Sequence, residues 1–279
     1  MDVIEAHARR LPKVDDRWVP RPFERRELEE ALLAGKVAGW AIHPLDNVRN
    51  NLRLLLEGDP DKLFGLSGIA GSIDFDEALR LVAKEAGAPI DPDARSGGVW
   101  IEPAPIVDAC EAMGDRLAAA GDRGERVVVA TGHPTGLALL YLELARLLHA
   151  NGATILKPAD GVEWRDERTN AVRRIRYLDG VAMLTGEDAP IHTHWPEAMR
   201  RILDDARPDL VIADHGFAGA AIEAGIETIS VADVNDPALI VAKAQGRTEI
   251  VVVMDDHVDP DAYWPCFQAV ASRFDGGPA

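Results

Sequence analysis

Short runs of apolar residues alternate with helical patterns along the second half of the chain. Five runs are continuous and rich in β-branched residues, which is typical of strands buried on both faces of a parallel sheet. Each run ends in His, Asp or Asn, and the segments concerned are 127–133, 181–194, 209–215, 228–236 and 249–257. We therefore expect strands and helices to alternate, with polar side chains gathered where the strands end.

Two further patterns refine the expected topology. The strand at 127–131, the long helical pattern at 135–152 and the apolar run at 153–158 form a β-α-β unit, which implies parallel strands. Arg and apolar residues alternate over 173–184 and predict a hairpin that turns at Asp179-Gly180.

The first half of the chain shows helical periodicity and no convincing strand. The predicted helices cover 23–35, 44–58, 74–87 and 102–121. The expected fold is α/β, with a Rossmann-like, mostly parallel sheet carrying helices on both faces. A mainly helical region, 1–124, precedes the α/β core, 125–279.

Open α/β sheets bind ligands just beyond the carboxyl ends of their strands. His133 stands between a strand and a helix predicted to begin near Pro134, so Thr135 and Gly136 would offer early helix amides to a phosphate. The alternative is that His133 only caps the helix. Lys157, at another strand end, is a weaker candidate for holding a phosphorylated substrate, as is Arg95 in a turn-rich loop.

A pair of histidines and an Asp-His dipeptide follow two other strands. His192 and His194, one residue apart, can project to the same side of an extended segment and act as metal or substrate contacts. Asp214 and His215 are candidates for a metal ligand and a general base, although an Asp before a helix can be a simple cap. The glycines after His215 would allow close backbone approach.

Two more strand ends are acidic. Asp233 and Asp255 are the better ligand candidates there. Asp236 and Asp259 each precede a proline and are interpreted as helix caps. At least one of the three residues 255–257 is expected to have no role in the site.

A divalent metal would resolve the charge conflict at this edge. Several carboxylates on one face repel a phosphate ester unless a cation neutralises them. Ligands of the types present suit Mg²⁺ or Mn²⁺, with Zn²⁺ also possible. The predicted metal ligands are Asp214, Asp233, Asp255, His192 and His194, and the predicted catalytic groups are His215, His194 and Asp214.

The net charge of −17 argues against nucleic acid and anionic membrane surfaces as partners. The first 18 residues carry charges where a signal peptide would have an apolar run, and no apolar run would span a bilayer. We expect a cytoplasmic protein that could form a homodimer. Cys110 and Cys266 are its only cysteines and are expected to be free thiols.

The segments ATGHPTGL, IHTHWP, ADHGFAGAAIEAGI and VADVNDPAL, in this order, resemble a bacterial, mostly actinobacterial, family known simply as phosphatase. The resemblance is clear over 125–274 and implies a Rossmann-like core and phosphatase activity. A more distant similarity in plan links the chain to the damage-control phosphatases, which place a metal at the carboxyl edge of an α/β core. Their Asp-Asn followed by a small residue has no counterpart, because Asp46-Asn47 precedes Val48 in a predicted helix.

Other phosphate-handling motifs are missing from the sequence: the Walker loop, GxGxxG and the DxDxT or DxDxS of haloacid-dehalogenase phosphatases. The leading hypothesis is a metal-dependent phosphatase that hydrolyses a small phosphorylated metabolite. The alternatives are a binding or sensing protein for a phosphorylated or nucleotide ligand, and a transferase acting on sugar phosphates or nucleotides.

Overall fold

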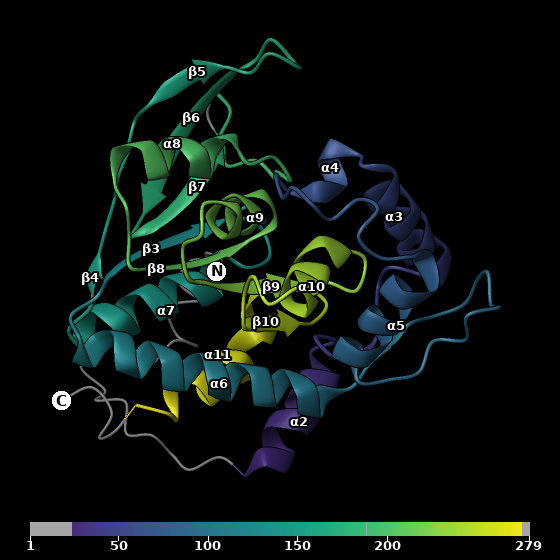
Figure 1. Ribbon diagram of the computed structural model, residues 1–279. Coiled ribbons are helices and arrows are strands. Elements are labelled where there is room, and N and C mark those ends of the chain that lie inside the picture. The colour runs from purple at the N-terminus through teal and green to yellow at the C-terminus, as the bar shows by residue number, and fades with distance from the viewer. Residues whose placement is uncertain (1–23, 188, 275–279) are drawn as a thin grey trace, which may run out of the picture.

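The computed structural model describes residues 24–187 and 189–274. The expectation for the charged residues at the start of the chain lies outside this described part. A mixed sheet of eight strands forms the centre of the molecule, in the order β10-β9-β8-β3-β7-β6-β5, with β4 beside β3 (Figure 1). Its strands are β3 (Arg126–Thr131), β4 (Thr154–Ile155), β5 (Glu163–Arg165), β6 (Val172–Leu178), β7 (Val181–Thr185), β8 (Leu210–Asp214), β9 (Thr228–Ala232) and β10 (Ile250–Val253).

The five strands expected to carry the site are parallel neighbours. β3 pairs in parallel with β7 and β8, β8 with β9, and β9 with β10. Every residue of β8 and β9 is buried, which explains why these segments are continuously apolar in the sequence. β6 and β7 form the predicted antiparallel hairpin, with Asp179 (φ 44°) and Gly180 (φ 93°) in its turn. The predicted parallel pairing of β3 and β4 is also confirmed.

Helices cover both faces of this sheet, as predicted (Figure 1). α6 (Pro103–Asp122), α7 (Ala138–Ala150) and α11 (Trp264–Ala271) pack together on one face. α8 (Glu197–Asp205), α9 (His215–Glu223) and α10 (Pro237–Ala244) lie on the other. A short 3₁₀ helix, η1 (Pro260–Tyr263), leads into α11. No helix among the described residues is long and apolar enough to cross a membrane.

The remaining helices come from the first half of the chain. They are α2 (Arg25–Ala34), α3 (Leu45–Glu57), α4 (Pro60–Leu63) and α5 (Phe75–Ala86). α5 packs on α10, and α2 packs on α6 and α11, so this half lies against the core.

The expectation that the first half has no strand was wrong. β1 (Gly39–Trp40) and β2 (Trp100–Ile101) pair in antiparallel fashion, with Trp40 opposite Trp100. Two-residue strands are too short to produce an alternating pattern, so no periodicity could reveal them.

Candidate active site

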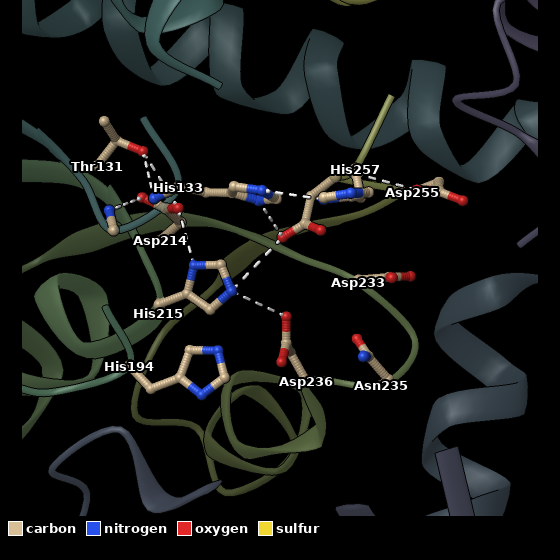
Figure 2. A network of polar contacts seen from close by, with 12 residues as sticks. Thr131, His133, His194, Asp214, His215, Asp233, Asn235, Asp236, Asp255 and His257 are labelled. Atoms are coloured by element: carbon tan, nitrogen blue, oxygen red, sulfur yellow. Dashed lines mark hydrogen bonds and ion pairs between the residues drawn. The ribbon is translucent and has the colours of Figure 1, made fainter. Parts of the chain in front are cut away.

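The carboxyl ends of the five parallel strands bring most of the predicted polar residues to one edge of the sheet, where His133, Asp214 and His215 are buried, His194 is half-buried and His192 is exposed (Figure 2). His133 follows β3, and the segment carrying His192 and His194 follows β7. Asp214 ends β8 and His215 begins α9, while Asp233 and Asp255 follow β9 and β10. The edge therefore assembles imidazoles and carboxylates from all five of these parallel strands.

Two glycines set the position of the histidine pair. A Cβ on Gly132 would lie 2.5 Å from the Thr193 carbonyl oxygen, and a Cβ on Gly216 would lie 2.4 Å from the His194 carbonyl oxygen. The Thr193 amide donates to the Gly132 carbonyl at 2.9 Å. Only glycine permits backbone to approach backbone so closely, so these residues hold the segment after β7 against the ends of β3 and β8.

Asp214 is fully buried and serves as a hydrogen-bond acceptor behind His215. Its carboxylate accepts from the Gly132 amide at 2.9 Å and the Thr131 hydroxyl at 3.3 Å. His215 Nδ1 lies 2.9 Å from Asp214 Oδ2, so the imidazole donates through Nδ1 and turns Nε2 towards the other site residues. This arrangement is the usual outer-shell support of a metal-binding histidine.

His215 has a left-handed backbone conformation, with φ 45°. A non-glycine residue in this region carries strain of order 1–3 kcal/mol, which neighbouring contacts must offset. Burial lowers the pKa of His215, but the carboxylates of Asp236 and Asp214 outweigh it and raise the pKa well above its usual range.

His133, His215 and Asp256 form what we call the inner group, all three buried and each offering one ligand atom within 4.8 Å of the others. His133 Nδ1 lies 3.4 Å and His215 Nε2 3.6 Å from Asp256 Oδ2. Neither His133 Nδ1 nor Asp256 Oδ2 has a hydrogen-bond partner among the described residues. Two buried, unsatisfied polar atoms that face each other are an arrangement that a cation would satisfy.

His192, His194 and His215 form the outer group, which is more accessible and also fits within 4.8 Å. Each pair of these imidazole rings has centroids 4.9 Å apart. His194 Nδ1 is 2.9 Å from Asp61 Oδ2, and this hydrogen bond lowers the pKa of Asp61. Desolvation, followed by the proximity of the other imidazoles, lowers the pKa of His192 to about 3, so His192 is neutral at pH 7.

A histidine from the first half of the chain, His43, pairs with a carboxylate of the core, Asp233. His43 Nδ1 lies 2.7 Å from Asp233 Oδ2, and the other Asp233 oxygen accepts from the Val234 amide at 2.6 Å. Burial, only partly opposed by His43, raises the pKa of Asp233 to about 7. Asp255 accepts from the Ile42 amide at 2.7 Å and from the His257 amide at 3.0 Å, so it ties β10 to the segment after β1.

The interpretation of Asp236 and Asp259 as helix caps is wrong, because neither side chain accepts a capping hydrogen bond. Asp236 Oδ2 instead lies 3.2 Å from His215 Nε2 inside the site (Figure 2). Burial would raise the pKa of Asp236, but the His215 imidazole reverses this effect and lowers it to about 2. A proline at the first helical position supplies the fixed backbone angle, so these helices begin without a capping side chain.

The expected phosphate contacts are only partly brought together. α7 begins at Ala138, four residues after the expected start at Pro134, and the Gly136 amide donates to the His133 carbonyl at 3.2 Å. Thr135 is exposed beside His133. Lys157 and Arg95 are exposed. β4 pairs only with the first two residues of β3, which leaves Lys157 short of the carboxyl edge.

Asp214, Asp233 and Asp255, the predicted carboxylate ligands, lie at the edge but in neither group. Their oxygens accept hydrogen bonds from neighbouring groups instead. Sequence reasoning missed His43 and Asp61 and left open which of Asp255, Asp256 and His257 face the site. His43 sits in a His-Pro-x-Asp sequence before α3, a signal no stronger than an ordinary helix start. Asp256 follows β10 together with Asp255 and His257, and the sequence does not show which of the three faces the site.

Five carboxylates, those of Asp214, Asp233, Asp236, Asp255 and Asp256, are buried at this edge. His215 has the largest effect in lowering the pKa of Asp236, and His194 and Lys62 act in the same direction. Buried charge is costly unless it is paired or coordinated. The arrangement is therefore suited to binding a cation and, through it, an anionic substrate.

The family described as Phosphatase matches residues 23–276 of the chain. The Streptomyces coelicolor protein named Phosphatase SCO2771 is 34% identical over 252 residues, which cover 88% of this chain and 94% of that protein. The match spans both the helical first half and the α/β core.

Proposed function

The chain belongs to the Phosphatase family, and we propose that it is a metal-dependent phosphatase that hydrolyses monoesters of a small phosphorylated metabolite. Family membership supports a hydrolase of phosphate esters. The observation that carries the metal dependence is the pair of buried, unsatisfied atoms, His133 Nδ1 and Asp256 Oδ2, 3.4 Å apart at the edge of the sheet.

We assign the cation to the inner group. His215 has one nitrogen free of Asp214, and this atom points towards Asp256 and Asp236. Because Nε2 of His215 can coordinate a single ion, His215 can complete the inner group or the outer group but not both. Without His215, the outer group keeps only two imidazoles, which are too few for a closed metal site. His133 thereby takes a role different from the phosphate contact that its position in the sequence favours.

The donor set supports Zn²⁺ or Mn²⁺ over Mg²⁺, because imidazole nitrogens stand beside carboxylate oxygens and Mg²⁺ prefers oxygen ligands. A bound divalent cation neutralises phosphoryl oxygens and acidifies a coordinated water. Asp236, with Oδ2 3.2 Å from His215 Nε2, is placed to join the ligand set.

The protein groups then have separate tasks. Asp214 fixes the tautomer and the direction of His215, as carboxylates do for metal-bound histidines. His192, neutral at pH 7, can donate one N–H to a phosphoryl oxygen. Asp61 holds His194 through Nδ1, which leaves Nε2 to carry a proton to the leaving-group oxygen.

Metal content and hydrolysis measured on the same samples test this proposal. The protein is dialysed against a chelator, its metals are quantified by mass spectrometry, and a panel of phosphate monoesters is offered with Mg²⁺, Mn²⁺ or Zn²⁺. We expect hydrolysis to disappear with the metal and to return with Mn²⁺ or Zn²⁺. Full turnover by metal-free protein, or no hydrolysis of any monoester with any of these ions, would contradict the proposal.

Two variants locate the ion. Asp256→Asn should reduce the bound metal, because it weakens a ligand of the inner group. Asp259→Asn is the matched control, since this carboxylate is exposed three residues further along and lies outside the group. Equal metal content in the two variants would move the ion away from Asp256.

A further inference from the structure

A groove runs from the inner group towards the short β1–β2 pair. His133, Gly136 and His257 line its catalytic end. Apolar residues from α2, from β1 and its flanking residues, and from β2 line much of the remainder, namely Leu33, Ala34, Ala38, Trp40, Ile42 and Trp100. We call this surface the tryptophan groove. It is continuous with the site, so a substrate with its phosphate at the edge of the sheet has its organic part within reach of the groove.

Trp40 is the most unusual residue of the groove. Its side chain is 67% exposed, and Ile42, two residues later, is 55% exposed. Leu33, which lines the same groove, is 38% exposed, so three exposed apolar side chains share this surface. Single exposed apolar residues are common, whereas a shared apolar surface often marks a ligand-binding groove.

The indole of Trp40 is also held in place. The Trp100 ring meets it edge-on, with centroids 5.2 Å apart and planes at 81°. A Cβ on Gly98 would lie 2.6 Å from the Trp40 ring, so the ring rests against bare backbone. A flat apolar surface that is fixed before binding loses little conformational entropy when a second ring stacks on it.

The charges of the groove select against an anionic occupant. Asp259 and Asp261 line the groove near η1, and Lys36 also belongs to its lining. Together with the net charge of −17, these carboxylates disfavour a second phosphate or a carboxylate at this end. A sugar alone is also poorly matched, because most of the wall offers no hydrogen-bonding groups.

We propose that the substrate is a phosphate monoester whose organic part carries a flat, uncharged ring, and that this ring stacks on Trp40. This inference rests on the proposed phosphatase activity and adds the substrate class. Nucleoside monophosphates and simple aryl-bearing phosphates share this chemistry.

Matched substrate pairs test the inference. Benzyl phosphate is compared with cyclohexylmethyl phosphate, and adenosine 5′-monophosphate with ribose 5-phosphate, each against the metal-loaded protein. Stacking on an aromatic side chain should favour the ring-bearing member of at least one pair by about tenfold or more in kcat/KM. The pair with the larger ratio identifies which source of the ring the groove accepts.

Three variants separate stacking from general damage. Trp40→Ala should remove the preference and raise KM about 10- to 100-fold with kcat changed less than about twofold, because the contact is made equally in ground and transition states. Trp40→Phe keeps a flat ring and should retain most of the preference. Leu178→Ala removes a similarly exposed apolar side chain, 56% exposed at the end of β6, and should leave all constants unchanged.

Binding of benzyl phosphate and adenosine 5′-monophosphate is measured in parallel by calorimetry, so the inference does not depend on turnover. Equal kcat/KM within both pairs, unaffected by Trp40→Ala, would overturn the ring assignment while leaving the phosphatase proposal intact. If Trp40→Ala changes the sedimentation coefficient and not KM, the groove is a contact between copies of the chain, and the inference is wrong. Failure of every monoester to react, with ring binding still lost in Trp40→Ala, would instead reject the phosphatase proposal.

Discussion

Replacing Asp214 by Asn separates the two roles that this carboxylate could have. As a ligand, it would contact the cation directly. In the structure it is fully buried and accepts hydrogen bonds from the Gly132 amide, the Thr131 hydroxyl and His215 Nδ1. Asn can keep the bond from Gly132 through Oδ1, but its amide nitrogen cannot accept from His215. The imidazole then favours the other tautomer and places its proton on Nε2, where the cation needs a lone pair.

The size of the effect follows from what is lost. A hydrogen bond to a charged group contributes about 1.5–3 kcal/mol. Removing an outer-shell partner of a metal ligand typically costs 10- to 100-fold in metal affinity, or about 1.4–2.8 kcal/mol. The two ranges overlap, so we expect Asp214→Asn to weaken Zn²⁺ or Mn²⁺ binding by one to two orders of magnitude, with kcat/KM reduced in parallel.

Competition with a fluorescent chelator measures the metal affinity, and a thermal melt of the metal-free protein confirms folding. Asp209→Asn is the matched control, because Asp209 lies at the opposite end of the same strand and contacts Arg126 at the surface. Affinity unchanged in Asp214→Asn would refute the orienting role. A loss beyond about 10⁴-fold, well above the outer-shell range, would show that Asp214 is itself a ligand.

Three further predictions concern packing, pH and thiol chemistry. Gly216→Ala should destabilise the protein by roughly 1–3 kcal/mol in chemical denaturation, because its Cβ would lie 2.4 Å from the backbone of His194 and Trp195. Gly186→Ala is the control: its Cβ would have no neighbour closer than 3.8 Å, so the free energy of unfolding should stay unchanged. Hydrogen bonding to Arg116 lowers the pKa of Glu227, so its stabilising effect is present above pH 4.5 and is lost as the pH falls further. Melting curves should show Glu227→Gln less stable than the parent at neutral pH and indistinguishable from it in strong acid. Cys110 is buried beside the second cysteine, and its pKa is raised by the contact between the two thiols and by burial. Neither thiol should react with Ellman's reagent until denaturant is added, and rapid labelling of the native protein would contradict this.

Much of the fold could be predicted because its signals are local. A strand buried on both faces must be apolar at every position, and β8 and β9 show this in consecutive residues. The turn at Asp179-Gly180 needs two residues with positive φ, which this dipeptide readily supplies. The rule that parallel strands place their carboxyl ends at one edge then predicts from the sequence alone that His133, His192, His194 and Asp214 lie together.

The parts that could not be predicted depend on residues distant in sequence. His43 and Asp233 are 190 positions apart, and Asp61 and His194 are 133 apart. No local pattern records such pairings. The predicted capping role of Asp236 was wrong for a different reason. Asp before Pro is a common helix start, and the sequence does not show that the side chain turns towards His215 instead.

These long-range pairs also explain why a helical first half accompanies an α/β core that already contains the strands. The inner group comes entirely from the core, but the imidazoles and carboxylates around it are held from outside. Asp61 fixes His194, and the segment after β1 supplies His43 to Asp233 and an amide to Asp255. The neighbouring strand β1 places Trp40 in the lining of the tryptophan groove. The core thus provides the proposed cation site, whereas the first half orients the histidine proposed as the acid and forms the surface proposed to select the substrate. A change in substrate preference can therefore arise in the first half of the chain without altering the inner group.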